Sequence, residues 1–193
     1  MNMKKIITSL FILVIMNTAN GQGHFDLGSN VIGLGIGFGG SLGSGYSYGT
    51  QTPALSLHFD HGMWELGGPG IVSIGGYVGY KSYKYDFSDA YGNSFSQKWN
   101  YTVIGVRSAY HYNGIKSDKF DVYGGLTLAY NIVNYTYSNN DPNYIYSASA
   151  SYGSSIYLAI YVGGKYYFSD NFAAFAELGS GIAYLNLGVA YKL

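Results

Sequence analysis

The sequence contains no cysteine and only three prolines, and charged residues make up 10% of its 193 residues. Without cysteine the chain can form no disulfide bond, no thiolate metal site and no lipid-modified cysteine anchor. After Gln22 there is no convincing stretch of 3.6-residue apolar periodicity and no apolar run near the roughly 20 residues that a membrane-spanning helix needs. These absences argue against a helical or a disulfide-stapled protein.

The first residues have the pattern of a secretory signal peptide. Lys4 and Lys5 precede an apolar run over 6–16, and the small residues Ala19 and Gly21 follow. We therefore predict that residues 1–21 are a signal peptide and that 22–193 form one exported domain. Its formal charge is −2, so its composition gives no reason to expect nucleic acid as a partner.

Glycine and tyrosine are abundant, with 29 and 23 copies, and they occur in segments of strict apolar alternation. Such period-two alternation is typical of strands with one apolar and one polar face. We place eight segments at 32–38, 55–59, 72–80, 104–112, 122–132, 156–168, 172–178 and 185–193. The opposite faces carry glycine and polar residues, among them Ser56, His58, Asp60, Tyr77, Lys81, Arg107, His111, Thr127, Asn131, Tyr157, Tyr161, Lys165, Glu177, Asn186 and Lys192.

The eight segments fit either a soluble barrel with its apolar face inside or a membrane barrel with that face against lipid. Two features favour the membrane barrel. Compact links at 62–70, 113–119 and 169–171 alternate with longer polar links at 41–52, 86–97 and 138–153, as in outer-membrane barrels. Aromatic residues gather at both margins of the apolar segments, as at two membrane interfaces. We assign Trp64, Tyr110, Tyr112, Tyr166, Phe168, Phe172 and Tyr191 to the short-turn margin and Phe38, Tyr80, Trp99 and Tyr130 to the other.

The run from Gly35 to Gly40 satisfies G-x-G-x-x-G, the pattern of dinucleotide-binding loops. That function requires a helix starting inside the glycine run and a parallel βαβ unit, and no helical pattern follows. We interpret these glycines as the inward face of the first strand, where missing side chains make room for tyrosines of neighbouring strands.

The last segment, AYLNLGVAYKL, is apolar at every second position up to the final residue: Leu185, Leu187, Val189, Tyr191 and Leu193. The mature chain resembles the small eight-stranded outer-membrane β-barrel proteins of the OmpA, OmpX and OmpW type, in the porin-like form common in Bacteroidota. The resemblance implies an all-β, eight-stranded antiparallel up-and-down transmembrane barrel with both termini in the periplasm. It implies outer-membrane lipid and lipopolysaccharide as surroundings, and the last segment resembles the signal read by the barrel-assembly machinery. Members usually end in phenylalanine, where this chain has Leu193.

Inside such a barrel Arg107, Lys165 and Glu177 are predicted to form a charge cluster, either a salt-bridged plug or part of an ion path. Ser56, His58 and Asp60 share a strand face, but successive same-face residues stand about 7 Å apart, too far for a catalytic relay. His58, Asp60, His61 and His111 show no spacing diagnostic of a metal site. We therefore predict no enzyme activity, no metal and no cofactor.

Tyrosines among serine, asparagine and glycine dominate the predicted outer loops, a composition typical of adaptable binding surfaces. The residues that we select are Tyr46, Tyr48, Tyr91, Tyr144 and Tyr146. We predict a structural or surface-interaction role through these loops, with an unknown extracellular ligand or host surface as partner. The alternative is a narrow porin or small-molecule channel, which bilayer conductance would distinguish. An outer-membrane enzyme and a secreted soluble barrel are the remaining readings.

Overall fold

The computed structural model describes residues 25–40, 49–66, 68–89, 92–115, 117, 119–139, 147–151 and 153–193. The predicted signal peptide lies outside these residues. No helix long and apolar enough to cross a membrane occurs among the residues described.

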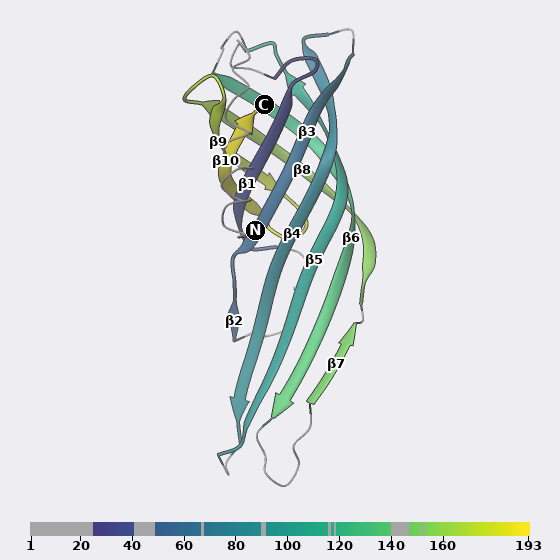
Figure 1. Cartoon of the computed structure of the whole chain (residues 1–193), viewed down its shortest axis with the longest axis vertical. Coiled ribbons are helices and arrows are strands. Elements are labelled where there is room, and N and C mark those ends of the chain that lie inside the picture. The colour runs from purple at the N-terminus through teal and green to yellow at the C-terminus, as the bar shows by residue number, and fades with distance from the viewer. Residues whose placement is uncertain are drawn as a thin grey trace, which may run out of the picture.

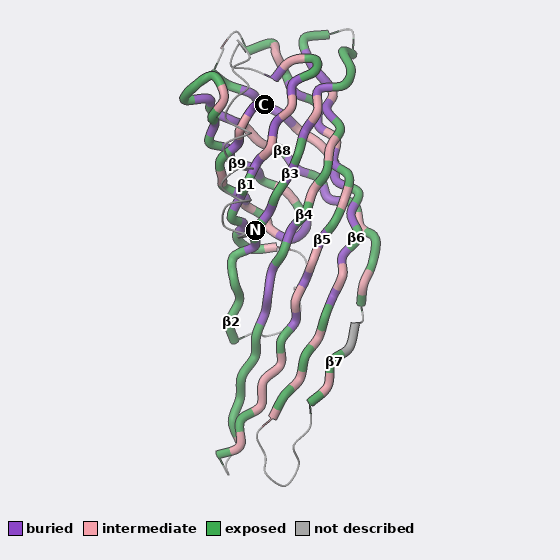
Figure 2. The backbone as a smooth tube through the Cα atoms, viewed as in Figure 1, coloured by how far each residue is buried: buried purple, intermediate pink, exposed green. Residues whose placement is uncertain are grey.

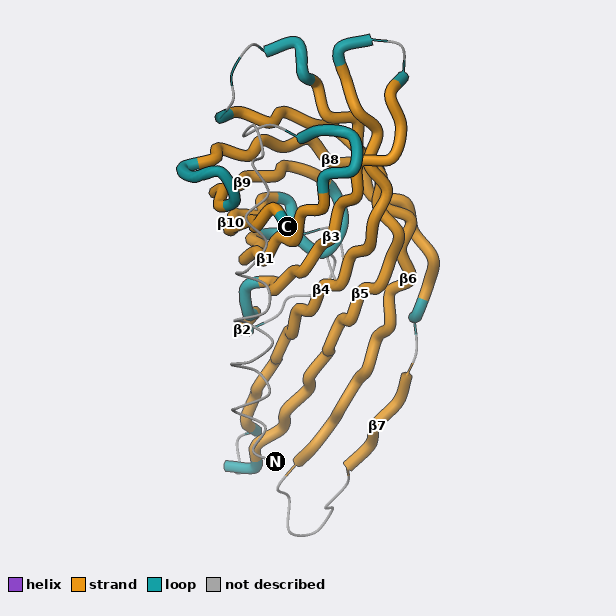
Figure 3. The backbone as a smooth tube through the Cα atoms, turned by 45° about the horizontal axis from the view of Figure 1, so that its top comes forward, coloured by secondary structure: helices purple, strands orange, loops and turns teal. Residues whose placement is uncertain are grey.

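Eight long strands form a closed antiparallel barrel (Figure 3). They are β1 (Asn30–Phe38), β3 (Ala54–Glu65), β4 (Gly70–Ser88), β5 (Ser94–Tyr112), β6 (Phe120–Asn139), β8 (Ser155–Tyr167), β9 (Phe172–Gly179) and β10 (Leu185–Lys192). Each pairs with its neighbour in the chain, and β1 pairs with β10 to close the ring. The predicted all-β, eight-stranded up-and-down barrel is therefore confirmed, and the antiparallel pairing of β1 on both sides leaves no place for a dinucleotide-binding loop.

Two short strands extend the sheet beyond the ring. β2 (Thr50–Gln51) pairs with β4 beyond the start of β3, and β7 (Ser147–Ser151) pairs with β6 beyond the start of β8. Figure 1 shows the result: β4, β5 and β6 run far past the barrel at the end opposite the short turns. The C-terminus lies at the short-turn end, where the backbone N–H of Lys192 donates to the carbonyl of Asn171 in the β8–β9 turn.

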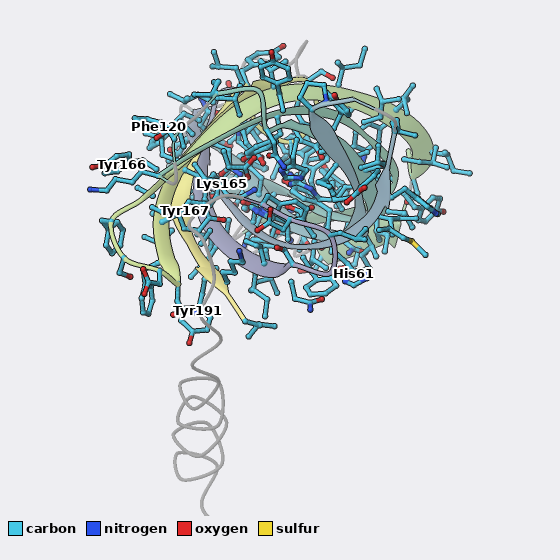
Figure 4. All side chains as sticks on the ribbon, turned by 90° about the horizontal axis from the view of Figure 1, so that it is seen from above. His61, Phe120, Lys165, Tyr166, Tyr167 and Tyr191 are labelled. Carbon is cyan, nitrogen blue, oxygen red and sulfur yellow. The ribbon has the colours of Figure 1, made fainter. Side chains whose placement is uncertain are left out.

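The wall of the barrel is apolar outside and polar inside. Outward side chains such as Leu128, 58% exposed, alternate with inward ones such as Arg107, 1% exposed. Figure 4 shows the alternation along β8, with Tyr166 outside the wall and Lys165 and Tyr167 inside it. Apart from the exceptions below, the side chains face as their parity in the sequence predicts.

The two faces exchange character at one level of the sheet. Up to the cross-strand row of Tyr80, Thr102 and Ile132, outward residues are mainly apolar. The next row, Ser82, Asn100 and Asn134, is polar, and the outward residues beyond it are serine, threonine, lysine and aspartate. Figure 2 shows that buried positions continue along β4 and β5 into the base of the protruding part. Because apolar outward residues suit lipid and polar ones suit water, this step marks the outer edge of the apolar band.

The step explains one wrong prediction. We expected a loop at 86–97, but β4 continues to Ser88 and β5 begins at Ser94, and just past these strands the backbone N–H of Asp89 donates to the carbonyl of Asn93. The outward face of this stretch is rich in serine, which is typical of loops. The alternation nevertheless continues, with polar side chains outward and aromatic side chains inward. Trp99 was assigned to the lipid margin, and it instead points inward and is buried with Tyr83, Tyr101 and Val133.

The glycines of β1 also differ in their partners from the prediction. A Cβ at Gly33 would overlap the ring of His58, one at Gly35 would meet the Asn186 side chain, and one at Gly37 would overlap Ala183. Within β1 the missing side chains therefore make room for a histidine, an asparagine and an alanine, whereas at Gly39, just beyond the strand, a Cβ would meet the ring of Tyr184. Their close approach still supports the interpretation that these positions face inward.

Candidate functional site: the lumen and the protruding sheet

The centre of the lumen holds a network of buried charges from five strands. Arg107 of β5 places Nε 2.9 Å from Asp60 Oδ1 of β3 and Nη2 2.8 Å from Glu177 Oε1 of β9. The Tyr123 hydroxyl donates to the same Glu177 oxygen at 3.0 Å. The guanidinium also lies over the ring of Tyr161, 4.4 Å from its centroid. Asp60, Glu177 and Arg107 thus form ion pairs with one another inside the lumen.

Lys165 carries the network toward the short-turn end. Its Nζ lies 3.1 Å from Asp121 Oδ2 and 3.9 Å from Asp60 Oδ2, and it sits 3.9 Å from the centroid of Tyr123. Asp60 therefore connects the arginine half to the lysine half. The structure thus places the predicted Arg107, Lys165 and Glu177 in one network, with direct contact between Arg107 and Glu177 and with Asp60 between Arg107 and Lys165.

Sequence reasoning did not assign Asp60 and Asp121 to this cluster. Both have inward parity, and Asp60 had been noted on the His58 face, so a search for every acid on the inward faces would have found them. Two cations and three carboxylates, each no more than 6% exposed, occupy the lumen at this level. Charges this deeply buried need close partners because desolvation is expensive.

Apolar clusters lie on both sides of the charges. At the short-turn end Phe25 is fully buried, stacks on His111 with 3.7 Å between centroids, and clusters with Val31, Ile71, Tyr167 and Phe175. The Asn113 side chain holds the carbonyl of Phe25 at 3.0 Å. Toward the other end Ile182, from the β9–β10 turn, packs on Ala54, Val103 and Ala129. Side chains therefore fill the lumen above and below the ions, as expected for an eight-stranded barrel.

A small cavity remains between Ile182 and the ions. It has a volume of about 50 Å³ and is lined by Tyr77, Arg107, Tyr157, Tyr161 and Glu177, among others. This space can hold only a very few water molecules.

Ser73, His111 and Asp121 have the connectivity of a hydrolase triad, which the sequence analysis did not detect. Ser73 Oγ lies 3.1 Å from His111 Nε2, and His111 Nδ1 lies 2.8 Å from Asp121 Oδ1. All three residues are at most 1% exposed, Phe25 covers the histidine face, and Lys165 shares the aspartate. A nucleophile needs room for the substrate carbonyl beside it, so in this conformation the relay is a structural hydrogen-bond chain.

The Ser56, His58, Asp60 row is not a relay either. Ser56 Oγ exchanges hydrogen bonds with the Asn186 side chain, and His58 Nε2 lies 3.8 Å from Asp60 Oδ2. His61 faces Asn30, with 2.9 Å between Nδ1 and Oδ1. Among the described residues no group of three or more histidine, aspartate or glutamate side chains could hold a metal ion.

The protruding part of β4, β5 and β6 has an aromatic inward face, here called the aromatic platform. Its members are Tyr83, Tyr85, Phe87, Phe95, Trp99, Tyr101, Tyr135 and Tyr137. The base is buried, whereas Tyr85 and Phe87 near the tip are 38% and 40% exposed. Phe87 and Phe95 stack with 4.8 Å between centroids and 12° between planes. The sequence signal for this face is the persistent alternation of aromatic residues with polar ones.

A hollow of about 530 Å³ lies at the tip of the protruding sheet. Phe87 and Phe95 line it together with Asp86, Ser88, Ser94, Ser96, Ser138 and Asn139. Lys84 Nζ lies 2.8 Å from Asp86 Oδ2, and this hydrogen bond, together with one from Ser96, holds the pKa of Asp86 below its usual value. Aspartate 86 therefore stays ionised and paired at neutral pH.

The remaining predicted sites are placed as follows. The outer tyrosines Tyr46, Tyr48, Tyr91, Tyr144 and Tyr146 lie outside the described residues. The proposed assembly signal falls on β10, with Leu187 and Val189 exposed on the outward face and Leu185, Tyr191 and Leu193 partly exposed.

The apolar outer wall and the filled, charged lumen define an eight-stranded transmembrane β-barrel. No family model matches the chain, and no curated protein matches it. Among solved structures, the chain is similar to Ail, the attachment invasion locus protein of Yersinia pestis. The complex of Ail with the heparin analogue sucrose octasulfate has a TM-score of 0.47 and 14% identity, over 86% of this chain and 97% of that one. The Ail structure in a phospholipid bilayer nanodisc has a TM-score of 0.41 and 14% identity, over 86% and 99% of the two chains.

Proposed function

We propose that this chain is a non-enzymatic integral protein of the outer membrane, with both termini in the periplasm, and that it acts by surface interaction. The observation that carries the proposal is the one-sided extension of β4, β5 and β6 beyond the apolar band (Figure 1). At about 3.4 Å per residue, the seven residues of β4 from Ser82 to Ser88 reach roughly 20 Å past its edge. A barrel that served only to span the membrane would not need strands that extend this far beyond the apolar band.

The lumen supports this role over the alternative of a narrow porin. Arg107 bridges two carboxylates at the centre, and apolar clusters around Phe25 and Ile182 close both sides. An ion would have to displace these side chains to pass. The same burial of Ser73 and His111 is the argument against an enzyme.

The surroundings follow from the same arrangement. The apolar band suits the acyl chains of lipid and lipopolysaccharide, and the alternating outward face of β10 suits recognition by the barrel-assembly machinery. With residues 1–21 removed on export, the short turns and both ends of the mature chain lie on the periplasmic side.

Single-cysteine labelling tests the orientation cleanly, because the natural chain has no cysteine. We expect a membrane-impermeant maleimide to label Ser96→Cys, on the protruding sheet, in intact cells. The matched control Ser169→Cys, in the exposed β8–β9 turn, should react only after the envelope is permeabilised. Labelling in the reverse order would contradict the proposed orientation.

Conductance separates the role from that of a channel. The mature protein, refolded into planar bilayers and shown to be folded by its heat-sensitive gel mobility, should give no current steps. Reproducible steps whose size or ion selectivity changes when Arg107 or Glu177 is changed would overturn the proposal in favour of a porin.

A further inference from the structure

Two lysines lie side by side on the outward face of β4 and β5, just beyond the outer edge of the apolar band. Lys84 and Lys98 are direct partners in the register of the two strands, and both are exposed. Each stands two positions past the polar row of Ser82 and Asn100 that marks this edge. Along a strand this is roughly 7 Å, about the depth of the headgroup region on one side of a bilayer. The two ammonium groups are therefore at the level of the lipid headgroups.

The charges of this patch are not balanced within the described part of the chain. Like charges directly opposite each other in a sheet repel. Asp86 compensates one of them, because Lys84 Nζ lies 2.8 Å from Asp86 Oδ2. Lys98 forms no ion pair with another described residue. The patch thus keeps a net positive charge beside the lipid, where an anion from outside the chain would be stabilised.

Uncharged hydrogen-bond donors lie between the lysines and the apolar band. Asn100 Oδ1 accepts from the Tyr80 hydroxyl at 2.9 Å and from Ser82 Oγ at 3.0 Å. These two bonds fix the orientation of the amide and leave its Nδ2 without an acceptor among the described residues. Asn134 is the cross-strand partner of Asn100 and continues the row on β6. The row can therefore donate to oxygen atoms of a headgroup.

On the membrane side of these donors the outward face is apolar. Val78, Ile104 and Tyr130 form one cross-strand row of exposed side chains on β4, β5 and β6. From mid-membrane outward, the face thus presents apolar side chains, then uncharged donors, then cations. Acyl chains, sugar and phosphate follow in the same order in the lipid part of lipopolysaccharide. A free phosphate or a soluble polyanion would contact only the cations.

We infer that this patch binds the phosphorylated sugar headgroup of lipopolysaccharide, with a phosphate between Lys84 and Lys98, sugar oxygens on Asn100 and Asn134, and acyl chains on the apolar band. Hydrogen bonds from ammonium groups to phosphate oxygens are stronger than bonds between neutral groups. The inference rests on the proposed function, because lipopolysaccharide reaches this patch only if the protruding sheet (Figure 1) faces the outside of the cell.

The test measures binding of purified lipid A, the acylated and phosphorylated part of lipopolysaccharide, to the full mature chain folded in detergent micelles. Native mass spectrometry counts the lipid molecules retained on each barrel. The parent should retain one lipid A, and Lys84→Ala/Lys98→Ala should bind it roughly tenfold more weakly or less still, because two cations are lost. Lys98→Arg keeps the charge and should bind as the parent does. Lys119→Ala is the matched control, since Lys119 is an exposed lysine at the short-turn end.

Three further probes identify what the patch recognises. Lipid A without its phosphates and phosphatidylglycerol should both be retained less than intact lipid A, and inorganic phosphate should not displace it. Equal retention of the dephosphorylated form would mean that the apolar band alone binds, and equal retention of phosphatidylglycerol would mean that only charge is recognised. Displacement by inorganic phosphate would indicate a site for the free ion. Each of these results would overturn the inference.

Unchanged retention in Lys84→Ala/Lys98→Ala, with its heat-sensitive mobility intact, would overturn it as well. Both lysines are exposed, so their loss leaves the packed lumen untouched. The binding measurement uses purified protein and does not depend on orientation in the cell, which the cysteine labelling reports separately. Weak lipid A binding with Ser96→Cys accessible in intact cells therefore rejects this inference alone, whereas reversed labelling rejects the proposed orientation.

Discussion

Arg107 and Glu177 join strands of the barrel that do not pair with each other. The 2.8 Å contact between Nη2 and Oε1 crosses from β5 to β9, with β6 and β8 between them in the wall. Its geometry depends on every intervening strand register. The contact is therefore a sensitive indicator of whether the barrel has closed with the correct registers.

Removing Glu177 should destabilise the barrel. Glu177→Ala leaves Nη2 of Arg107 without its carboxylate and the Tyr123 hydroxyl without an acceptor. We expect a loss on the order of 3 kcal/mol, because breaking a buried ion pair strands the remaining charge. The urea midpoint of unfolding from liposomes measures it. Glu177→Gln keeps an oxygen for Tyr123 and should lose less; an unchanged midpoint in Glu177→Ala would show that water already screens this pair.

The edge of the apolar band makes a prediction within a single strand. Leu128→Arg on β6 places a charge in the acyl-chain region and should cost roughly 2–4 kcal/mol. Thr136→Arg lies eight residues further along the same outward face, beyond the row of Ser82, Asn100 and Asn134. Its cost should be near zero, because the side chain is in water. Equal losses on refolding into liposomes would contradict the position assigned to the edge.

The charge cluster and the outward face of β6 show which features the alternation along a strand predicts well. Parity along the strands correctly predicted that Arg107, Lys165 and Glu177 face inward and that Leu128 faces outward, since one strand residue fixes the facing of the next. It did not predict that Asp60 would lie between Arg107 and Lys165. That contact depends on the stagger of strands around the ring, which is a property of the closed barrel and not of any one segment.

The errors at 86–97 and at Trp99 have a common cause. At 86–97 and at Trp99 the sequence alternates as elsewhere, but water replaces lipid outside the sheet and the polarity reverses. A rule that expects apolar residues on the outward face therefore predicts a loop at 86–97. Phe25 was missed for another reason: it precedes the first strand and takes part in no alternation, so only the folded chain brings it against His111.

The glycines offer a matched pair of substitutions. At Gly33 a new Cβ would overlap the His58 ring, whereas at Gly76, on the outward face, it would meet no atom within 4 Å. We expect Gly33→Ala to cost about 1–3 kcal/mol through overpacking. Gly76→Ala should be neutral or stabilise by up to about 1 kcal/mol, because the unfolded chain loses freedom. Urea midpoints of both variants decide it, and equal effects would mean that Gly33 does not face the packed lumen.

The Ser73, His111 and Asp121 chain leads to a prediction that separates architecture from catalysis. If the hydrogen bonds among Ser73, His111 and Asp121 are only structural, a serine-reactive fluorophosphonate should not label the folded protein, because Phe25 and the barrel wall leave no room beside Ser73 Oγ. Ser73→Ala removes one partner of His111 and should lower stability by about 1 kcal/mol, the usual value of a buried neutral hydrogen bond. Phe25→Ala is the informative companion, since it uncovers the histidine ring at the short-turn end. Labelling of Phe25→Ala that disappears when Ser73→Ala is added would mean that the relay is a competent nucleophile kept closed by one side chain. Labelling of the unmodified barrel at Ser73 would contradict the structural assignment outright.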